Sequence, residues 1–368
     1  MMRRKFPKYL SLSGVAAFWN GAARLASGKS ANPYYSGPPE RNFDGTLFFN
    51  PDGQAPRAFA DFLKWQLFER RARWPETFPS PFEGTKPEHR QEQLTITMIG
   101  HATLLIQVSG LNFLTDPVFS DRASPLSFAG PKRITKPGVA LQDLPPIDFV
   151  LLSHNHYDHL DLASLRALVD AHDPLIITPH GNDTIVRKAI PDAHLETGNW
   201  DDIVAVNATT SVHFEPVHHW SARGTRDRRM ALWAGFVIEA RAGKIYVVGD
   251  TGFHEGINYR AAAQKHGGFD AAILPIGAYD PSWFMEAQHQ NPEEAVKGHL
   301  LCRAKVSIAH HWGTFQLTNE PLQEPVERLA KARSANNVAE HAFIILRPGE
   351  AWSDKTPSRP LSSTRQSA

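Results

Sequence analysis

Short apolar runs with the length of β-strands recur along most of the chain. They lie at residues 94–99, 103–108, 112–114, 148–152 and 174–179 in the first half, and at residues 211–215, 231–239, 244–248, 270–274, 306–309 and 342–346 in the second. Apolar residues at helical spacing lie between them, at residues 160–171, 259–265, 292–301 and 321–333. Strands mixed with helices predict an α/β layered domain, and the repeated style predicts two similar halves that divide near residue 205.

An earlier helix is predicted over residues 57–74, where Phe59, Phe62, Leu63 and Leu67 recur at helical spacing. Trp65 and Phe68 lie off this stripe, so the helix has two apolar faces. One interpretation is packing on the domain, and the other is contact with a membrane or an acyl chain.

The two ends of the chain differ in composition from the middle. Residues 1–40 begin with a basic cluster and a mildly apolar stretch that Asn20 and Arg24 interrupt, which is too short for a confident spanning helix. This segment is interpreted as a signal or anchor, or as an extended or surface segment. Residues 41–348 are predicted to form a single catalytic domain, and residues 349–368, rich in Ser, Pro and Arg, a disordered tail.

The composition is that of a soluble globular protein. Of 368 residues, 42% are hydrophobic and 21% are charged, and the net charge of +1 gives no reason to expect nucleic acid as a partner. The single cysteine, Cys302, excludes an internal disulfide framework and is expected to be a small buried residue. Histidine, at 18, is the unusual count, and the placement of these residues matters most.

Four strand-like runs end in residues that can bind metals. The motifs are S-H-N-H-Y-D-H at residues 153–159, E-P-V-H-H-W at residues 215–220, G-D-T-G at residues 249–252 and H-H-W-G at residues 310–313. Ligands at the carboxyl ends of neighbouring strands converge on one edge of an α/β domain. An isolated histidine at a strand end is usually structural, and His101, His180 and His213 are interpreted in that way.

The spacing of the first motif favours two metal ions. His154 and His156, two positions apart in an extended segment, project to one side, while Asp158 and His159 point to a second position. Seven candidate ligands are too many for one tetrahedral ion and suit two Zn²⁺ or similar divalent ions about 3.5–4 Å apart. His219 and His311 are preferred over their neighbours because each stands in the context H-H-W. The predicted ligands are His154, His156, Asp158, His159, His219, Asp250 and His311, with Asp250, an isolated carboxylate after a buried strand, as the bridge.

Longer motifs extend this pattern over roughly residues 96–316. They include G-H-A-T at residues 100–103, F-L-T-D-P-V-F-S-D-R-A-S-P at 113–125, G-P-K-R at 130–133, L-P-P-I-D at 144–148, P-I-G-A-Y at 275–279, W-F-M at 283–285, Q-H-Q-N-P-E-E-A-V at 288–296 and H-W-G-T-F at 311–315. On these motifs the chain resembles the N-acylphosphatidylethanolamine-hydrolysing phospholipase D family of the metallo-β-lactamase fold superfamily. The first ninety residues and the tail match this family weakly.

The resemblance implies an αββα four-layer sandwich, in which two mixed sheets are flanked by helices. It also implies that His154, His156 and His219 hold one zinc, that Asp158, His159 and His311 hold the other, and that Asp250 bridges them. Tyr157 and His289 would face the substrate head group, with Gln288 nearby. Asp158, Asp250 and His289 are the expected catalytic residues.

The implied reaction is zinc-dependent hydrolysis of a phospholipid. A metal-bridging hydroxide would attack the phosphorus, and His289 could protonate the leaving group, giving phosphatidate and an N-acylethanolamine. The expected partner is a phospholipid at a membrane surface, the expected location is peripheral on a membrane face that the sequence does not identify, and a homodimer is left open. Two alternatives are a lactonase or phosphodiesterase that acts on a soluble substrate and a non-catalytic membrane-associated module, although seven intact ligands argue against the second.

Overall fold

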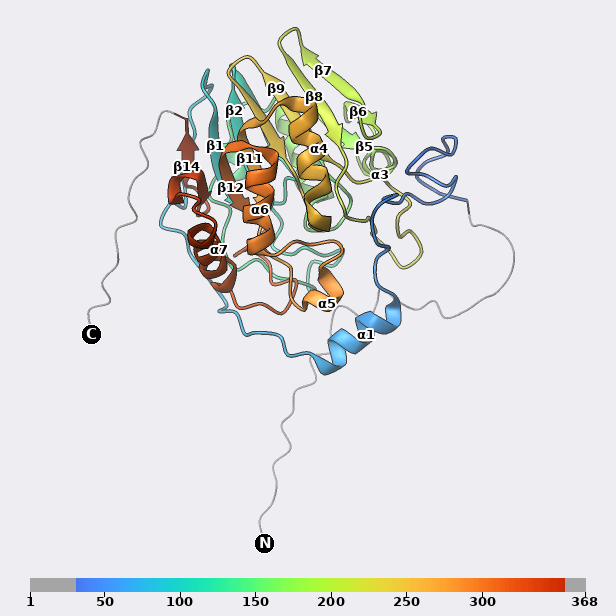
Figure 1. Cartoon of the computed structure of the whole chain (residues 1–368). Coiled ribbons are helices and arrows are strands. Elements are labelled where there is room, and N and C mark those ends of the chain that lie inside the picture. The colour runs from blue at the N-terminus through green and yellow to red at the C-terminus, as the bar shows by residue number, and fades with distance from the viewer. Residues whose placement is uncertain (1–30, 355–368) are drawn as a thin grey trace, which may run out of the picture.

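Two mixed β-sheets pack against each other at the centre of the molecule (Figure 1). The computed structural model describes residues 31–354. In the first sheet the strand order is β14-β1-β2-β3-β4-β5-β6. Its strands are β1 (Thr95–Gly100), β2 (Thr103–Val108), β3 (Leu111–Thr115), β4 (Phe149–Leu151), β5 (Leu175–Pro179), β6 (Leu195–Gly198) and β14 (Ala351–Ser353).

The second sheet has the order β13-β12-β11-β10-β9-β8-β7. Its strands are β7 (Ile203–Asn207), β8 (Thr210–Glu215), β9 (Gly235–Ala240), β10 (Gly243–Val247), β11 (Phe269–Pro275), β12 (Ala304–His310) and β13 (Phe343–Ile345). Each sheet begins as an antiparallel meander and continues with parallel strands. The chain changes sheets between β6 and β7, close to the predicted division of the halves.

Helices cover the outer faces of both sheets (Figure 1). The helices are α1 (Phe59–Phe68), α2 (Leu162–His172), α3 (Asn182–Ala189), α4 (Ile257–His266), α5 (Ser282–Met285), α6 (Pro292–Cys302) and α7 (Glu324–Ala335), and short 3₁₀ turns lie at Leu141–Asp143, His254–Gly256 and Glu340–Ala342. Leu165 of α2 and Val186 of α3 join the apolar cluster outside the first sheet. Val296 of α6 and Leu329 of α7 pack on the second sheet. The predicted αββα four-layer sandwich is therefore confirmed.

Alternate residues of the central strands enter different apolar clusters, which explains why these strands are apolar on both faces. In β2, Leu104 and Ile106 belong to the core between the sheets, whereas Leu105 belongs to the cluster under α2 and α3. Phe149 and Val150 of β4 divide between the two clusters in the same way. A strand buried on both faces carries a continuous apolar run. Strands buried in this way fix the positions of the loops that follow them, and the candidate site lies on those loops.

The C-terminal boundary differs from the prediction. Within the predicted tail, β14 pairs antiparallel with β1, with Trp352 opposite Ile96, and the Gly349 N–H donates to the Met98 carbonyl at 2.7 Å. The prediction of a disordered tail is wrong for residues 349–354, because an edge strand depends on a partner that is distant in the sequence rather than on local composition. Residues 1–30, which carry the basic and apolar N-terminal pattern, and residues 355–368 lie outside the described residues.

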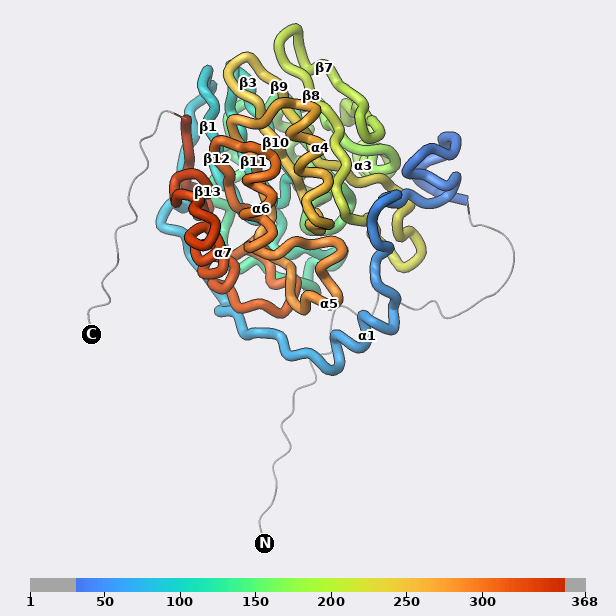
Figure 2. Tube along the Cα trace, in the orientation of Figure 1, coloured from blue at the N-terminus to red at the C-terminus, as the bar shows by residue number. Residues whose placement is uncertain are grey.

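The N-terminal helix is shorter than the predicted span of residues 57–74. It ends at Phe68, and the chain then runs extended along the lower edge of the molecule to β1 (Figure 2). There the Ala72 N–H donates to the Asn319 carbonyl at 2.9 Å, a bond that a helix would not permit. Trp65 packs on Phe284 of α5 with ring centroids 5.0 Å apart. None of the helices within residues 31–354 has the length and apolarity needed to cross a bilayer.

Candidate metal centre

Four loops from both sheets meet at one place. They follow β4 in the first sheet and β8, β10 and β12 in the second. The predicted ligands on these loops, together with His101 and His289, form four groups in which the candidate ligand atoms lie within 4.8 Å of one another. The structure thus brings all seven predicted ligands together from the two halves of the chain.

Three imidazoles form the first group, which we call site A: His154, His156 and His219. His154 Nε2 lies 2.9 Å from His156 Nδ1, and His219 Nε2 lies 3.1 Å from the same nitrogen of His156. His154 and His219 are buried and His156 is partly so. Because His219 comes from the second sheet, site A joins the two halves.

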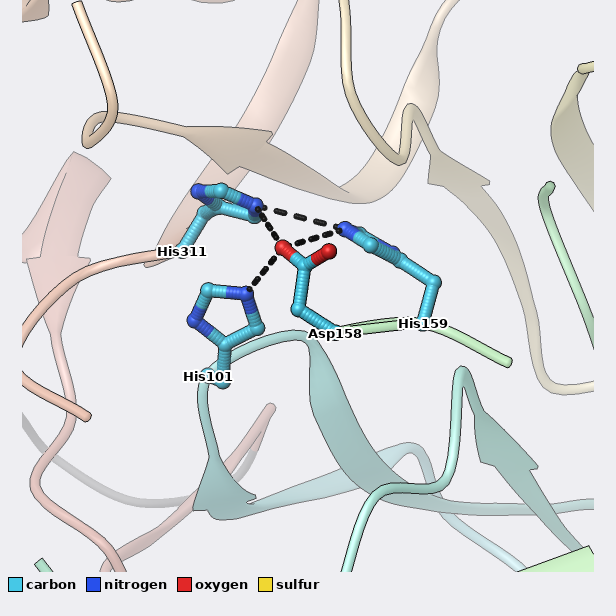
Figure 3. Close-up of side chains that lie close together, drawn as sticks. All are labelled: His101, Asp158, His159 and His311. Atoms are coloured by element: carbon cyan, nitrogen blue, oxygen red, sulfur yellow. Dashed lines mark hydrogen bonds and ion pairs between the residues drawn. The ribbon is translucent and has the colours of Figure 1, made fainter. Parts of the chain in front are cut away.

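The second group, which we call site B, contains Asp158, His159 and His311, with His101 beside them (Figure 3). His159 Nε2 and His311 Nε2 lie 3.2 Å apart. Asp158 Oδ2 lies 3.3 Å from His311 Nε2 and 3.5 Å from His159 Nε2. His101 Nε2 approaches the same oxygen to 3.0 Å. Site B therefore pairs imidazoles with a carboxylate of its own.

Asp250 lies between the two sites. Its Oδ2 is 3.7 Å from His219 Nε2 and 4.0 Å from His154 Nε2 in site A. The same atom is 3.1 Å from His159 Nε2 and 3.2 Å from His311 Nε2 in site B. The side chain is buried, and its other oxygen, Oδ1, has no hydrogen-bond partner among the described residues. One carboxylate can thus reach both sites.

Electrostatics separates the two sites. At site A, burial lowers the pKa of His154 and His219 well below the usual value, and lowers that of His156 to about 4. These imidazoles are therefore neutral at pH 7, which is the form that binds metals.

At site B the direction reverses. Burial alone would lower the pKa of His311, but Asp250 and the hydrogen bond to Asp158 outweigh it and raise the pKa to about 9. The pKa of His159 is likewise raised well above its usual value, against burial, by Asp250 and Asp158. Burial opposes ionisation of Asp158 and Asp250, yet the neighbouring His159 holds the pKa of both carboxyls well below the usual value. Positive charge stabilises the carboxylates at this site, and either imidazolium protons or a divalent cation can supply it.

Outer hydrogen bonds fix the tautomers of two site A imidazoles, His154 and His219. Ser153 Oγ donates to Asp116 Oδ2 at 2.6 Å, so it accepts from His154 Nδ1 at 2.9 Å. The backbone carbonyl of Gln288 accepts from His219 Nδ1 at 3.0 Å. In both rings the proton lies on Nδ1, and the lone pair of Nε2 points into the site. The converging lone pairs fit a cation and include no thiolate, a donor set suited to zinc or a similar divalent ion.

Asp116 is a supporting residue that the sequence analysis does not single out. It follows β3, is buried, and accepts from His159 Nδ1 at 2.8 Å as well as from the backbone and hydroxyl of Ser153. It thereby directs His159 Nε2 into site B. Asp116 lies in the F-L-T-D-P motif, at the end of an apolar run, so the strand-end rule that singled out Asp250 could have found it.

His289 and Gln288 lie on the loop before α6. The His289 ring is 5.0 Å from that of His219 and 5.5 Å from that of His311, so it faces both sites. Burial lowers the pKa of His289 to about 4. Asn291 and Glu294 form a capping box at the start of α6, and this box anchors the end of the loop. Gln288 Nε2 donates to the Gln54 carbonyl at 3.2 Å, which links the loop to the N-terminal segment.

Tyr157 packs beneath an arginine of the loop after β8. The Arg223 guanidinium lies 3.9 Å from the centre of the Tyr157 ring, and the Tyr157 hydroxyl donates to the Arg223 carbonyl at 3.1 Å. The same guanidinium donates to the carbonyls of Asn155 and Leu160 at 3.0 and 2.8 Å. Arg223 thus spans the loop that carries four predicted ligands, a role that its sequence context does not reveal.

The neighbouring histidines of the H-H-W motifs lie elsewhere. His218 contacts Asp52 and Asn258, and its ring stacks on His254 with centroids 3.9 Å apart. The His310 ring is 6.1 Å from that of His311 and belongs to none of the ligand groups found among the described residues. The structure therefore brings only the second histidine of each pair into the centre.

Comparisons with known proteins agree with this architecture. Residues 111–312 match the family model described as a beta-lactamase superfamily domain. The Caenorhabditis elegans protein named N-acyl-phosphatidylethanolamine-hydrolyzing phospholipase D 1 is 36% identical over 281 residues, which are 72% of this chain and 77% of the relative. A mitochondrial Saccharomyces cerevisiae protein named N-acyl-phosphatidylethanolamine-hydrolyzing phospholipase D is 34% identical over 63% of this chain and 50% of the relative. The crystal structure of an isothiocyanate hydrolase from Delia radicum gut bacteria superposes with a TM-score of 0.57 and 21% identity, covering 70% of this chain and 99% of that one.

Proposed function

The chain belongs to the N-acyl-phosphatidylethanolamine-hydrolyzing phospholipase D family of the beta-lactamase superfamily, and on this premise we propose that it is a metal-dependent phosphodiesterase of the phospholipase D type. Its substrates would be N-acylphosphatidylethanolamine-like phospholipids and its products phosphatidate and N-acylethanolamine. The observation that carries the proposal is the pair of sites that share Asp250 beside His289.

In this proposal each site holds one Zn²⁺. His154, His156 and His219 would hold the first ion, and Asp158, His159 and His311 the second, with Asp250 between them. When bound, two such ions neutralise the phosphate oxygens and lower the pKa of a coordinated water. Asp116 and the Gln288 carbonyl keep the imidazoles oriented while the substrate exchanges.

The remaining chemistry belongs to side chains of this chain. A bond forms between water oxygen and phosphorus, the bond from phosphorus to the head-group oxygen breaks, and the leaving alkoxide takes up a proton. The attacking water gives up a proton, and His289, which faces both sites, is proposed to take it up and to deliver it to the leaving alkoxide. Gln288, adjacent to His289, and Tyr157, in the loop between the ligands His156 and Asp158, are proposed to contact the head group.

Access to a lipid substrate requires a surface that meets the membrane, and α1 is the proposed surface. Leu67 and Phe68 are 72% and 79% exposed. Lys64 and Arg70 are exposed beside them, and such cations favour an anionic lipid surface. This face would hold the enzyme peripherally, with one side of α1 packed on α5 and the other in the interface.

The decisive test of the proposed function is product analysis in ¹⁸O-labelled water. The protein, loaded with Zn²⁺, is incubated with vesicles of N-acylphosphatidylethanolamine, and Asp250→Asn protein is the inactive control. We expect N-acylethanolamine without label and phosphatidate with one ¹⁸O, because water attacks phosphorus. Label in the N-acylethanolamine, or turnover only of a soluble lactone or phosphodiester, would refute the assignment, and binding without turnover of any ester would favour the non-catalytic reading.

Membrane docking is tested separately by vesicle flotation. Leu67→Ser and Phe68→Ser should weaken recovery with anionic vesicles and slow hydrolysis of vesicle lipid, while hydrolysis of lipid in detergent micelles changes little. Ile203→Ser is the matched control, since Ile203 is 59% exposed on β7, away from α1. Equal effects of all three substitutions would remove α1 as the docking face. Light scattering of the same preparations tests whether the protein forms a homodimer.

A further inference from the structure

His101 is a buried histidine that the predicted ligand set does not include. It follows β1 directly, is 2% exposed, and points its ring at Asp158 (Figure 3). His101 Nε2 lies 3.0 Å from Asp158 Oδ2, the oxygen that also faces His159 and His311. This contact with the carboxylate of a candidate ligand is not expected of a purely structural histidine, which is how the sequence analysis interpreted His101.

The backbone around His101 is built for this position. His101 has φ 58° and His311 has φ 65°, a left-handed conformation that is unfavourable for non-glycine residues. The two are joined, because the His311 N–H donates to the His101 carbonyl at 3.0 Å, and the His101 N–H donates to Thr314 Oγ1 at 2.9 Å. Surrounding contacts thus hold both rings in place at a conformational cost, which is typical of functional positions.

The ring of His101 is packed as tightly as its backbone. It lies 4.0 Å from the ring of His311 and meets Phe315 edge-on at 5.3 Å. The Arg133 guanidinium packs over the Phe315 ring, 4.9 Å from its centre. His101 therefore has a fixed orientation in which only Nε2 reaches the carboxylate.

The protonation of the ring follows from its partners. Among the described residues, Nδ1 has no hydrogen-bond partner, whereas Nε2 faces a carboxylate that can only accept. The proton belongs on Nε2, and the ring is a donor to Asp158.

The position of Asp250 distinguishes a donor from a further metal ligand. Ion pairs of Asp250 with described residues run to His154, His159, His219 and His311, but not to His101. The group that contains His101 likewise omits Asp250. His101 thus contacts Asp158 directly and makes no ion pair with the carboxylate that both sites share, among the residues described.

We propose that His101 is a positioning residue for site B: its Nε2–H holds Asp158 Oδ2 and thereby fixes the direction in which this carboxylate meets a cation. Ligating carboxylates are commonly hydrogen-bonded from outside, and the loss of such a partner typically lowers metal affinity about 10–100-fold. The inference rests on the metal-dependent chemistry proposed above, but not on the identity of the substrate.

The test compares metal binding by three variants. His101→Ala removes the donor, His101→Gln keeps an N–H donor at similar reach, and His180→Ala is the matched control. His180 also follows a strand, β5, and its ring stacks on Tyr35 at 4.8 Å rather than on the metal centre. Metal per chain, the rate of Zn²⁺ release to a chelator, the absorption spectrum with Co²⁺ and the unfolding midpoint are measured for each.

We expect His101→Ala to release one of the two ions about 10–100-fold faster than the native protein, while His101→Gln stays within a few-fold of it and His180→Ala does not differ. The Co²⁺ absorption should keep its intensity and band positions in His101→Gln, because no ligand is lost. Unchanged release in His101→Ala would overturn the proposal, as would equal losses in the Ala and Gln variants or altered Co²⁺ bands in His101→Gln, which would make His101 a ligand. These readouts need no substrate, so failure of lipid hydrolysis leaves the test intact.

Discussion

Sites A and B differ in charge more than in the number of ligands. Site A is made of three imidazoles whose pKa values are lowered by burial, whereas site B has a carboxylate of its own, and the pKa values of His159 and His311 are raised despite burial. Both draw ligands from both sheets, and both reach Asp250. The comparison shows that two adjacent sites can offer a cation ligands in different protonation states. A cation at site B competes with protons for the ligands, while a cation at site A meets imidazole lone pairs that carry no proton.

The largest effect is expected where the two sites meet. Asp250→Asn keeps the volume of the side chain but removes the shared negative charge. Stabilisation by a metal pair is worth several kcal/mol, so activity should fall about a thousandfold or more. Metal analysis should show that at least one ion is lost. Full metal content together with native activity would end the idea that Asp250 connects the sites.

Acid and base should destabilise the metal-free protein through different sites. A raised pKa stabilises the fold below the unfolded value, so the contribution of His311 is complete below pH 6.5 and is lost as the pH rises through about 9. A lowered pKa acts in the opposite sense, so the contribution of His156 is complete above pH 6.5 and is lost as the pH falls through about 4.

The free energy of unfolding of the metal-free protein should therefore be highest near pH 6.5, and mutations can assign the loss on each side of this pH to one residue. Unfolding of metal-free protein is followed with denaturant at a series of pH values, and each limb should amount to about 3 kcal/mol per residue. His311→Gln should flatten the alkaline limb, and His156→Gln the acidic limb. If each substitution flattened the limb assigned to the other site, the electrostatic contrast would be reversed.

Substitution of the residues that hold the ligands by hydrogen bonds should have a smaller effect, which differs between the two sites. Asp116→Asn weakens the orientation of His159 in site B and of Ser153 behind His154, so metal affinity should fall about 10–100-fold. Ser153→Ala removes the direct partner of His154 and only one of the donors to Asp116, so its effect should be larger at site A than at site B. Competition with a coloured chelator resolves the two ions, and loss confined to site A in both variants would show that Asp116 does not support His159.

The smallest effect should fall on both sites equally. Arg223→Lys keeps the charge but cannot bond both Asn155 and Leu160 in the same way, which should cost about 1 kcal/mol and about a fivefold change in metal release. Arg228→Lys is the matched control, since Arg228 lies over Trp220, 4.5 Å from its ring centre, in the same loop. Release from only one site would show that the loop does not move as a unit.

Local patterns revealed the strands that are buried on both faces, because each of these carries an unbroken apolar run, whereas β6 and β7, which have exposed positions, were not predicted. β14 was missed because its three residues become a strand only through pairing with β1. The strand-end clusters were visible for a similar reason, since several titratable residues follow one apolar run. His101 and Asp116 stand alone in their motifs, and their importance comes from Asp158 and His159, 57 and 43 residues away. The spacing of residues within a motif does not indicate partners so far away in the sequence, and these partners become apparent only in the folded chain.

The late pairing of β14 with β1 also sets an order of events during synthesis. At about 5–20 residues per second, a ribosome needs about 8–30 s to travel the 152 residues from His159 to His311, so the first half, with four of the predicted ligands, leaves the ribosome long before the remaining ligands are synthesised. The edge of β1 stays open longer still, until residues 351–353 have emerged. For that interval the nascent chain combines an unpaired strand edge with an incomplete set of ligands, and chaperones and cellular metal buffers would meet it in this form.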